Sequence, residues 1–280
     1  MIVGDFMIVN SRNILIKAKK NKIAIPHFNI NNLEWTKYIL EECNKNNSPV
    51  ILGVSESAIK YMGGTKTVVN IITALDSELK IKVPVVIHLD HGSSVEICKK
   101  AIDDGFTSVM IDASNYSLKD NIKITKKVVE YAEKYSVSVE AELGHIGDDN
   151  NYYTNIDEAK LFVKETNIDS LAPAIGTVHG IYKSKPHLDI DLCNRISKEI
   201  DIPLVLHGGS GLDNLTLKKA VNAGICKVNI NTELQIVWSN ALKKYLKDNG
   251  KVYDPRKIIS SGENDMKKII KEKINILSSN

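Results

Sequence analysis

The stretch VPVVIHLDHG, residues 83–92, is the part of the sequence from which the fold can be inferred. Its apolar and β-branched residues predict a strand that is buried on both faces, and its polar end stops at a glycine. The next segment, Val95–Gly105, places apolar residues three and four apart, which predicts an amphipathic helix that ends at Gly105. A buried strand followed by such a helix is typical of a parallel sheet covered by helices.

The same strand–helix unit recurs along the chain. Seven further apolar runs are Lys22–Asn29, Pro49–Ser55, Ser108–Ser114, Ser136–Gly144, Ser170–Gly176, Pro203–Gly211 and Cys226–Glu233. Segments with the helical period lie between them, among them Asn31–Asn47, Leu118–Tyr135 and Asn214–Gly224. Eight such units in about 250 residues is the size of a TIM barrel.

A doubly wound open sheet is the competing architecture, but it would place a G-x-G-x-x-G turn after the first strand, and the sequence HFNINNLE has none. We therefore predict an α/β protein with one (β/α)8 barrel domain over residues 1–280. The stretch Asn264–Leu277 predicts an extra C-terminal helix, which we expect to be available for packing against a partner subunit.

Composition excludes several classes of protein. The 280 residues are 43% hydrophobic and 25% charged, which excludes a disordered chain. No run reaches the roughly 18 apolar residues of a membrane span, and MIVGDFMIVN lacks the layout of a signal peptide. The four cysteines form no C-x-x-C pair, and the net charge of +3 comes from dispersed lysines rather than from a basic block. We expect a soluble cytoplasmic protein with neither a nucleic-acid nor a membrane partner.

Three of the predicted strands end in histidines beside glycines. They are HLDHG at residues 88–92, GTVHG at 176–180 and HGGSG at 207–211. Because the active site of a TIM barrel lies at the C-terminal ends of its strands, these imidazoles should converge at one mouth. Three imidazoles with an open fourth position are the ligands of a catalytic zinc ion, and the alternative is a set of core histidines. His88 alternates with Asp90 whereas His91 lies past the turn, so His88 could support the site rather than bind metal.

Carboxylates gather at the same strand ends, namely Asp90, Asp112 and the pair Glu140 and Glu142. An acid there could donate a proton or offer a metal ion an alternative position. Asp112 fits a helix cap or a hydrogen-bond acceptor equally well. Asp90 is a candidate general acid because it directly precedes a candidate metal ligand.

Two polar segments follow the seventh and eighth runs. Gly208-Gly209-Ser210-Gly211 and Asn229-Ile230-Asn231-Thr232 occupy the usual phosphate site of the barrel, where backbone N–H groups hold an anion. The alternative is a tight turn and a helix that is N-capped by Thr232 or Asn231. Together the two segments favour phosphate binding.

Six segments, in order, resemble the zinc-dependent class II fructose-1,6-bisphosphate and tagatose-1,6-bisphosphate aldolases, in particular their short Bacillus-type branch. These segments are IHLDHG (87–92), SVMIDAS (108–114), VEAELG (139–144), PAIGTVHGIYK (173–183), LHGGSG (206–211) and KVNINTE (227–233). The resemblance implies a lyase of glycolysis that reversibly cleaves a ketose bisphosphate to dihydroxyacetone phosphate and an aldehyde phosphate. It makes His91, His179 and His207 the Zn²⁺ ligands and Asp90 the acid that serves the C4 oxygen. Asp112 and Glu142 match carboxylates near an alternative metal position.

The resemblance also implies substrate contacts. Residues that match those around the substrate phosphate, or stand in the same motifs, are Gly180, Lys183, Gly208, Gly209, Ser210, Asn229, Asn231 and Thr232, with a monovalent cation (Na⁺ or K⁺) beside the phosphate. Asn29 and Ser55 match polar positions on the substrate side. Arg256 resembles an arginine that reaches the distal phosphate of a neighbouring subunit, which implies a homodimer or homotetramer. In the alternative mechanism, Lys183 or Lys227 would form a Schiff base, and the three histidines would then have no role.

One loop departs from the family pattern. The family carries a Gly-Gly-x-Glu-Asp loop whose glutamate assists proton transfer at C3, whereas residues 144–152 here read GHIGDDNNY, with Asn150 at the place of the glutamate. Asp148 or Asp149 could replace the missing base, the enzyme could have an altered substrate or a lower rate, or the barrel could bind metal and phosphate without catalysis. The sequence NINTE resembles the Asn-Thr-Glu form of fructose-bisphosphate enzymes, which favours fructose 1,6-bisphosphate over tagatose 1,6-bisphosphate or another ketose phosphate.

Overall fold

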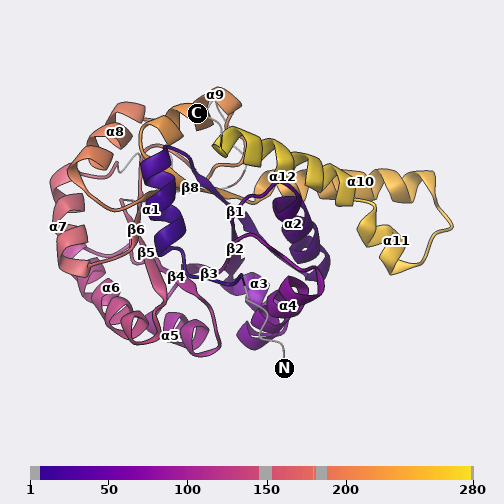
Figure 1. The fold of residues 1–280 in the computed structure, drawn as a ribbon, viewed down its shortest axis with the longest axis horizontal. Coiled ribbons are helices and arrows are strands. Elements are labelled where there is room, and N and C mark those ends of the chain that lie inside the picture. Colours follow the sequence, from indigo (N-terminus) through magenta and orange to yellow (C-terminus); the bar gives the residue numbers. More distant parts are fainter. Residues whose placement is uncertain (1–6, 145–152, 179, 181–187, 279–280) are drawn as a thin grey trace.

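The computed structural model describes residues 7–144, 153–178, 180 and 188–278. Eight parallel strands form a closed barrel in the order in which they occur along the chain (Figure 1). They are β1 (Ile25–Asn29), β2 (Val50–Ser55), β3 (Val85–Gly92), β4 (Ser108–Ile111), β5 (Ser138–Leu143), β6 (Ser170–Pro173), β7 (Leu204–Leu206) and β8 (Ile225–Ile230). The predicted α/β TIM barrel is confirmed. Most strands are shorter than the predicted runs, whose polar ends continue into loops.

Helices surround the barrel (Figure 1). They are α1 (Arg12–Asn21), α2 (Leu33–Lys45), α3 (Glu56–Tyr61), α4 (Thr65–Glu78), α5 (Val95–Asp103), α6 (Leu118–Ala132), α7 (Ile156–Thr166), α8 (Ile190–Glu199), α9 (Asn214–Asn222), α10 (Thr232–Asp248), α11 (Pro255–Ser260) and α12 (Glu263–Ser278), with a 3₁₀ turn at Glu133–Tyr135. Several begin at a polar cap: the side chain of Ser94 accepts the N–H of Ile97, and that of Asp213 accepts the N–H of Thr216. In the described part of the chain, no helix has the length and apolarity needed to cross a bilayer.

Helix α1, which the strand pattern does not predict, lies across one end of the barrel (Figure 1). Its buried residues Ile14, Leu15 and Ala18 pack against strand residues that include Ile51 and Val86. Arg12 fastens the helix, since its Nη2 donates to the carbonyl oxygen of Val137 at 2.7 Å. The N-terminal end of the barrel is therefore covered by this helix.

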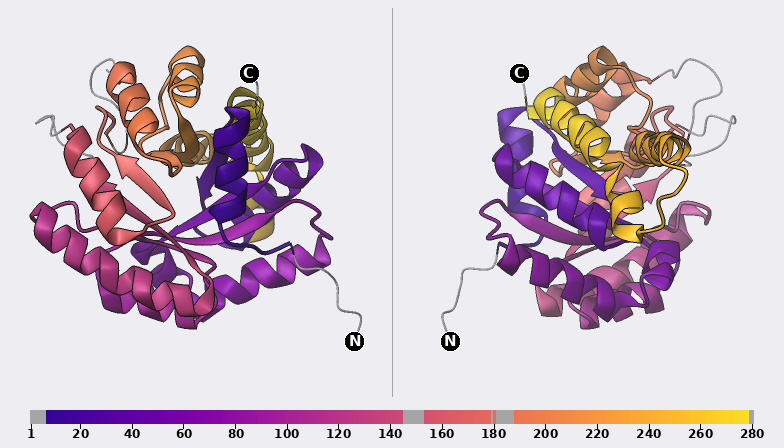
Figure 2. Two further views of the ribbon diagram at one scale, coloured as in Figure 1. Left: turned by 60° about the vertical axis from the view of Figure 1, so that its left-hand side comes forward. Right: turned by 90° about the vertical axis from the view of Figure 1, so that its right-hand side faces the viewer.

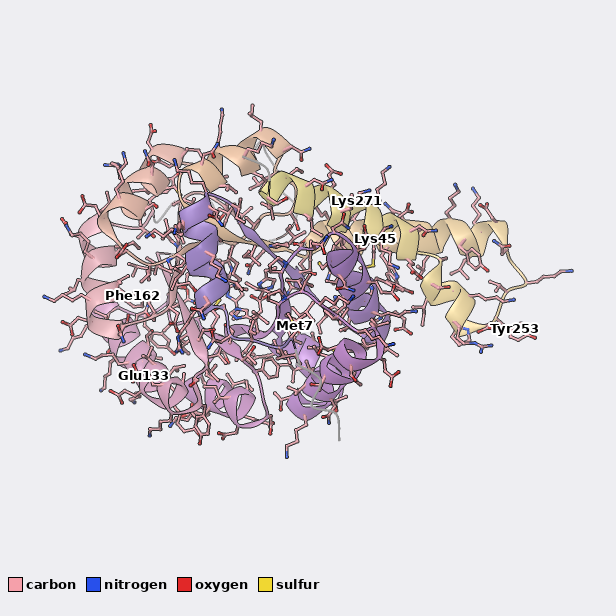
Figure 3. The ribbon with its side chains drawn as sticks, in the orientation of Figure 1. Met7, Lys45, Glu133, Phe162, Tyr253 and Lys271 are labelled. Carbon is pink, nitrogen blue, oxygen red and sulfur yellow. The ribbon has the colours of Figure 1, made fainter. Side chains whose placement is uncertain are left out.

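The predicted C-terminal helix is present as α12, but its apolar face is used by its own barrel. Met266, Ile270 and Leu277 are buried, and the helix contacts α2, α9 and β1 (Figure 2). The apolar face of α12 is therefore not available to a partner subunit, and packing of the rest of the helix against a partner stays a prediction. The elements that project from the barrel are α10 and α11, with Tyr253 near the end of this arm (Figure 3).

The interior of the barrel is partly polar. His27, His88, Glu140 and Lys227, from four different strands, are all buried there. The ring of His27 occupies the place where a side chain on β2 would stand, because a Cβ added to Gly53 would lie 1.7 Å from His27 Nε2. This interior polar layer lies directly beneath the site described next.

Candidate active site

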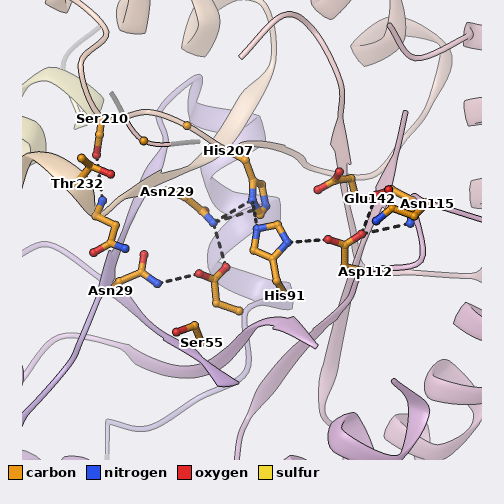
Figure 4. Close-up of a pocket in the computed structure, with 15 residues that line it drawn as sticks. Asn29, Ser55, His91, Asp112, Asn115, Glu142, His207, Ser210, Asn229 and Thr232 are labelled. Atoms are coloured by element: carbon orange, nitrogen blue, oxygen red, sulfur yellow. Dashed lines mark hydrogen bonds and ion pairs between the residues drawn. The ribbon is translucent and has the colours of Figure 1, made fainter. Parts of the chain in front are cut away.

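A cavity of about 320 Å³ opens at the C-terminal ends of the strands (Figure 4). It is lined by Asn29, Ser55, Asp90, His91, Asp112, Ser114, Asn115, Glu142, Gly180, His207, Gly208, Ser210, Asn229, Asn231 and Thr232. Most of the predicted site residues thus meet in one cavity. Ser114 and Asn115 were not predicted and come from the loop after β4. The predicted residues Asp148, Asp149, His179 and Lys183 lie outside the described residues.

His91 stands at the end of β3 in an unusual backbone conformation. Its φ is 52°, in the left-handed region that a residue with a side chain seldom adopts, and the β3–β4 register shifts between Leu89 and Gly92. Nδ1 of His91 lies 2.9 Å from Oδ2 of Asp112, whose Oδ1 accepts a hydrogen bond from Ser114. Asp112 therefore orients the His91 ring. This agrees with one of the alternatives from the sequence, in which Asp112 is a hydrogen-bond acceptor.

His207 follows β7 and faces His91. Nδ1 of His207 lies 2.9 Å from Nε2 of His91, and Nε2 of His207 lies 3.0 Å from Oε1 of Glu140. The outer nitrogen of each ring faces a carboxylate, which can only accept a hydrogen bond when ionised, and the inner nitrogens of the two rings face each other. These facing nitrogens share a proton in a hydrogen bond, and a metal ion could take the place of that proton.

The charges around these rings favour a cation. Burial lowers the pKa of His91, but the hydrogen bond to Asp112 and the charges of Asp90, Glu142 and Asp112 outweigh it and raise the pKa to about 9. Ligand atoms of Asp90, His91 and His207 all lie within 4.8 Å of one another, and His91, Asp112 and Glu142 form a second such group. The imidazole and carboxylate donors present here fit a divalent metal ion.

Asp90 lies at the end of β3 with both carboxylate oxygens bound. Nδ2 of Asn29 donates to Oδ2 at 2.7 Å, and Nδ2 of Asn229 donates to Oδ1 at 3.4 Å. Burial acts to raise the pKa of Asp90, but the surrounding His27, His91, His207 and Lys227 hold it well below its ordinary value. The site therefore holds an ionised carboxylate in a fixed orientation next to the two imidazoles.

The glycine-rich turn after β7 approaches other backbone closely. Gly208 has a φ of 68°, and a Cβ there would lie 2.3 Å from the carbonyl oxygen of Val178. The hydroxyl of Ser210 accepts the N–H groups of Asn231 and Glu233 at 3.0 and 3.4 Å. Ser210 therefore caps α10. The sequence had offered the side chain of Asn231 or Thr232 as the cap. For Asn231 this is wrong, because its side chain makes no capping hydrogen bond. The start of α10, Ser210 and Gly180 border the same cavity.

Arg256 and Lys227 lie apart from the cavity lining. The Arg256 side chain, on α11, is 90% exposed and pairs with Asp254. Lys227 is 1% exposed and lies 2.6 Å from Oε2 of Glu140. Its burial and ion pair argue against a Schiff base at Lys227.

Of the side chains beneath the cavity, the sequence drew attention to His88, Glu140 and Lys227, but it gave no role to His27. His27 is completely buried, with Nε2 3.9 Å from Oδ2 of Asp90, and burial together with the charge of Lys227 lowers its pKa well below the ordinary value. The signal that could have found His27 is its alternation with Asn29 on β1, which turns both side chains toward the barrel interior.

Comparisons with known proteins agree with this geometry. The family described as "Fructose-bisphosphate aldolase class-II" matches residues 9–280. The chain is 49% identical over 267 residues to the fructose-bisphosphate aldolase of Geobacillus stearothermophilus, covering 93% of each chain. It is 47% identical over 274 residues to that of Staphylococcus aureus, covering 95% of this chain and 96% of the other. Among solved structures, the YdjI aldolase from Escherichia coli K12 superposes with a TM-score of 0.86 at 33% identity, covering 97% of this chain and 98% of that one.

Proposed function

The chain belongs to the class II fructose-bisphosphate aldolase family, a family of lyases, and on this premise we propose that it reversibly cleaves fructose 1,6-bisphosphate to dihydroxyacetone phosphate and glyceraldehyde 3-phosphate. The observation that carries the proposal is the pair of imidazoles, His91 and His207, whose facing nitrogens lie 2.9 Å apart beside Asp90. The cavity that contains them also includes a turn suited to phosphate. This combination fits metal-assisted cleavage of a sugar phosphate.

The metal ion in this proposal is Zn²⁺, held by His91, His207 and His179, the last of which lies outside the described residues. The neutral nitrogens of the first two rings suit zinc, and Asp112 and Glu142 offer carboxylate oxygens for an alternative position. When bound, zinc supplies a Lewis acid that polarises the carbonyl group of the substrate.

Asp90 is the proposed proton carrier at the C4 oxygen. In cleavage it takes the C4 hydroxyl proton as the C3–C4 bond breaks, and in condensation it returns this proton. The amides of Asn29 and Asn229 support this role because they hold both carboxylate oxygens in place. Ser55, whose hydroxyl also lies at the cavity, is the proposed further contact to the substrate.

The phosphate of the dihydroxyacetone part is proposed to bind where β7 and β8 end. Gly208, Gly209 and Ser210 form the turn after β7, although Gly209 itself does not line the cavity, and Gly180 borders the cavity from the segment that follows β6. Asn231 and Thr232 open α10, whose N-terminus favours an anion. The buried Oδ1 atoms of Asn229 and Asn231 accept no hydrogen bond from the described residues, and such neutral oxygens suit the monovalent cation, Na⁺ or K⁺, expected beside the phosphate. Lys183, outside the described residues, is proposed as a further substrate contact.

The distal phosphate is proposed to meet Arg256 of a second copy of the chain. Arg256 lies on the projecting arm and away from its own cavity, so it can serve a phosphate only at another subunit's site. The arm carries exposed apolar residues, among them Ile236 and Leu246, which support a homodimer, or a homotetramer built from dimers.

The metal mechanism is tested on purified protein loaded with zinc. We expect a chelator to abolish cleavage of fructose 1,6-bisphosphate and added zinc to restore it, whereas borohydride with substrate should leave activity unchanged. Covalent trapping on a lysine by borohydride would overturn the metal mechanism. Cleavage rates on the fructose and tagatose epimers, measured side by side, decide the substrate, and faster cleavage of the tagatose epimer would contradict our choice.

The loop base is the second point to test. Because Asn150 stands where the family has glutamate, we propose that Asp148 or Asp149 takes the C3 proton instead; all three lie outside the described residues. Asp148→Ala or Asp149→Ala should lower kcat by about a hundredfold or more, the usual contribution of a general base. Full activity in both variants would remove the idea of a substitute base.

A further inference from the structure

A continuous chain of buried polar side chains runs beneath the cavity. Oε1 of Glu140 lies 3.0 Å from Nε2 of His207, and Oε2 of Glu140 lies 2.6 Å from Nζ of Lys227. Nζ of Lys227 continues to Nε2 of His88 at 3.3 Å, and Nδ1 of His88 meets the hydroxyl of Ser108 at 2.8 Å. Glu140, Lys227, His88 and His207 are only 1–2% exposed.

A buried polar network costs more free energy than an apolar filling of the barrel. The interior of a TIM barrel is ordinarily packed with branched apolar side chains, and removing two charges from water costs more than burying such residues. None of Glu140, Lys227 and His88 borders the cavity, so they do not meet the substrate directly. The only link from this network to the cavity among the bonds named above is the contact between Glu140 and His207.

Only one assignment of donors and acceptors satisfies all the hydrogen bonds of this network. Lys227 donates to Oε2 of Glu140 and to Nε2 of His88, because an ammonium group has no acceptor. His88 then donates from Nδ1 to Ser108. With Oε2 bound to Lys227, Oε1 of Glu140 accepts the Nε2–H of His207.

We propose that Glu140, anchored by Lys227, is a positioning residue that holds His207 with the proton on Nε2, so that the unprotonated Nδ1 can bind the metal ion. Asp112 plays the same part for His91, where the carboxylate faces Nδ1 and Nε2 is turned toward the metal position. Each ligand ring thus has its own carboxylate, and the carboxylate of His207 is in turn held by a buried lysine. This inference rests on the proposed function, because it takes His207 as a metal ligand.

Two nearly isosteric variants test the proposal. In Glu140→Gln, Lys227 remains and holds the amide oxygen, so the NH2 group faces His207 and favours the wrong tautomer. Zinc affinity of the full chain, measured by competition with a chelating indicator, should fall by about 10–100-fold. In the double variant Glu140→Gln, Lys227→Met the amide is free to turn its oxygen to His207, and zinc affinity should recover by about tenfold or more.

Two further measurements separate positioning from general stability. Nitrogen-15 NMR of labelled histidine should report Nε2–H for His207 in the wild type and in the double variant, and the Nδ1–H form in Glu140→Gln. Asp169→Asn, which breaks the ion pair with Arg12 near the covered end of the barrel, should leave zinc affinity unchanged. If both Glu140 variants bind zinc like the wild type, or if the double variant binds it more weakly than the single one, the proposal is overturned. If the wild-type chain itself binds no zinc, the proposed function fails, and the positioning role fails with it.

Discussion

A side chain at Gly53 would clash with His27, whose ring fills the place where that side chain would stand. A Cβ at this position would lie 1.7 Å from His27 Nε2, and His27 in turn lies 3.9 Å from Asp90. These two contacts show how closely the barrel interior is packed beneath the site. The His27 ring therefore links Gly53 to Asp90, the proposed proton carrier.

Gly53→Ala should therefore displace His27. Overpacking a filled interior costs about 1–3 kcal/mol, and we expect a loss of this size in the free energy of unfolding measured with urea. Gly250→Ala is the matched control, since nothing lies within 4 Å of a Cβ there, and its free energy of unfolding should change by at most about 0.5 kcal/mol. Equal stability of the two variants would contradict the packing argument.

Asp90→Asn tests the proton carrier. The amide has the shape of the carboxylate but cannot take the C4 proton, so kcat for bisphosphate cleavage should fall by about 10²–10⁴-fold. Metal content, measured by atomic emission, should be retained because the imidazole ligands are unchanged. Asp201→Asn, at a fully exposed carboxylate, should keep wild-type kcat. An Asp90→Asn enzyme with wild-type kcat would exclude this carboxylate as the acid.

At the scale of elements, α10 links the phosphate turn to the projecting arm. Its first turn is held by the hydroxyl of Ser210, which comes from the loop after β7 rather than from the helix itself. Lys273 of α12 is buried and lies 2.9 Å from Glu233 in the same turn, so α12 fixes the start of α10 from the other side. The proposed phosphate site is thus held by three separate segments.

Ser210→Ala should have two effects. Loss of the cap should cost about 1 kcal/mol of stability, and the freed helix start should raise the KM for fructose 1,6-bisphosphate. Ser117→Ala removes a comparable cap from α6, where the hydroxyl accepts the N–H of Asp120, and should lower stability without changing KM. A KM that changes equally in both variants would show that stability alone is being measured.

At the scale of the whole molecule, the predicted site residues are divided between the barrel and the arm. The barrel carries the proposed metal and phosphate residues, whereas Arg256 lies on the arm with its side chain 90% exposed. A site that needs both parts must be shared between subunits. Helices α10 and α11 project to one side of the barrel (Figure 1), and Arg256 is not among the residues that line the cavity.

Subunit mixing tests this sharing. Arg256→Ala and Asp90→Asn should each be nearly inactive at low substrate concentration. After the two variants are unfolded and refolded together, activity should return, because mixed dimers then contain one site with both Asp90 and Arg256. Refolding each variant alone is the control. Failure of the mixture to regain activity, with dimers demonstrated by light scattering, would place Arg256 outside the neighbouring site.

The sequence by itself determined the barrel and predicted most of the residues that line the cavity, including the proposed metal, acid and phosphate residues. These follow from local patterns: apolar runs of strand length, helical periodicity, and polar residues such as Asp90, His91 and His207 at or just after the end of a strand. In a parallel barrel all strand ends meet at one mouth, so the end of a run is enough to place a residue.

Only the tertiary structure decided which partners these residues have. Glu140 and His207 are 67 residues apart, and His91 and His207 are 116 apart, so no local pattern could pair them. The approach of the His27 ring to Gly53 depends on the register of β1 and β2, which pairs His27 with Ile51 and Asn29 with Gly53. The packing of α12 depends on its contacts with α2 and α9. Register and helix packing arise from contacts between distant segments, whereas periodicity belongs to each segment alone.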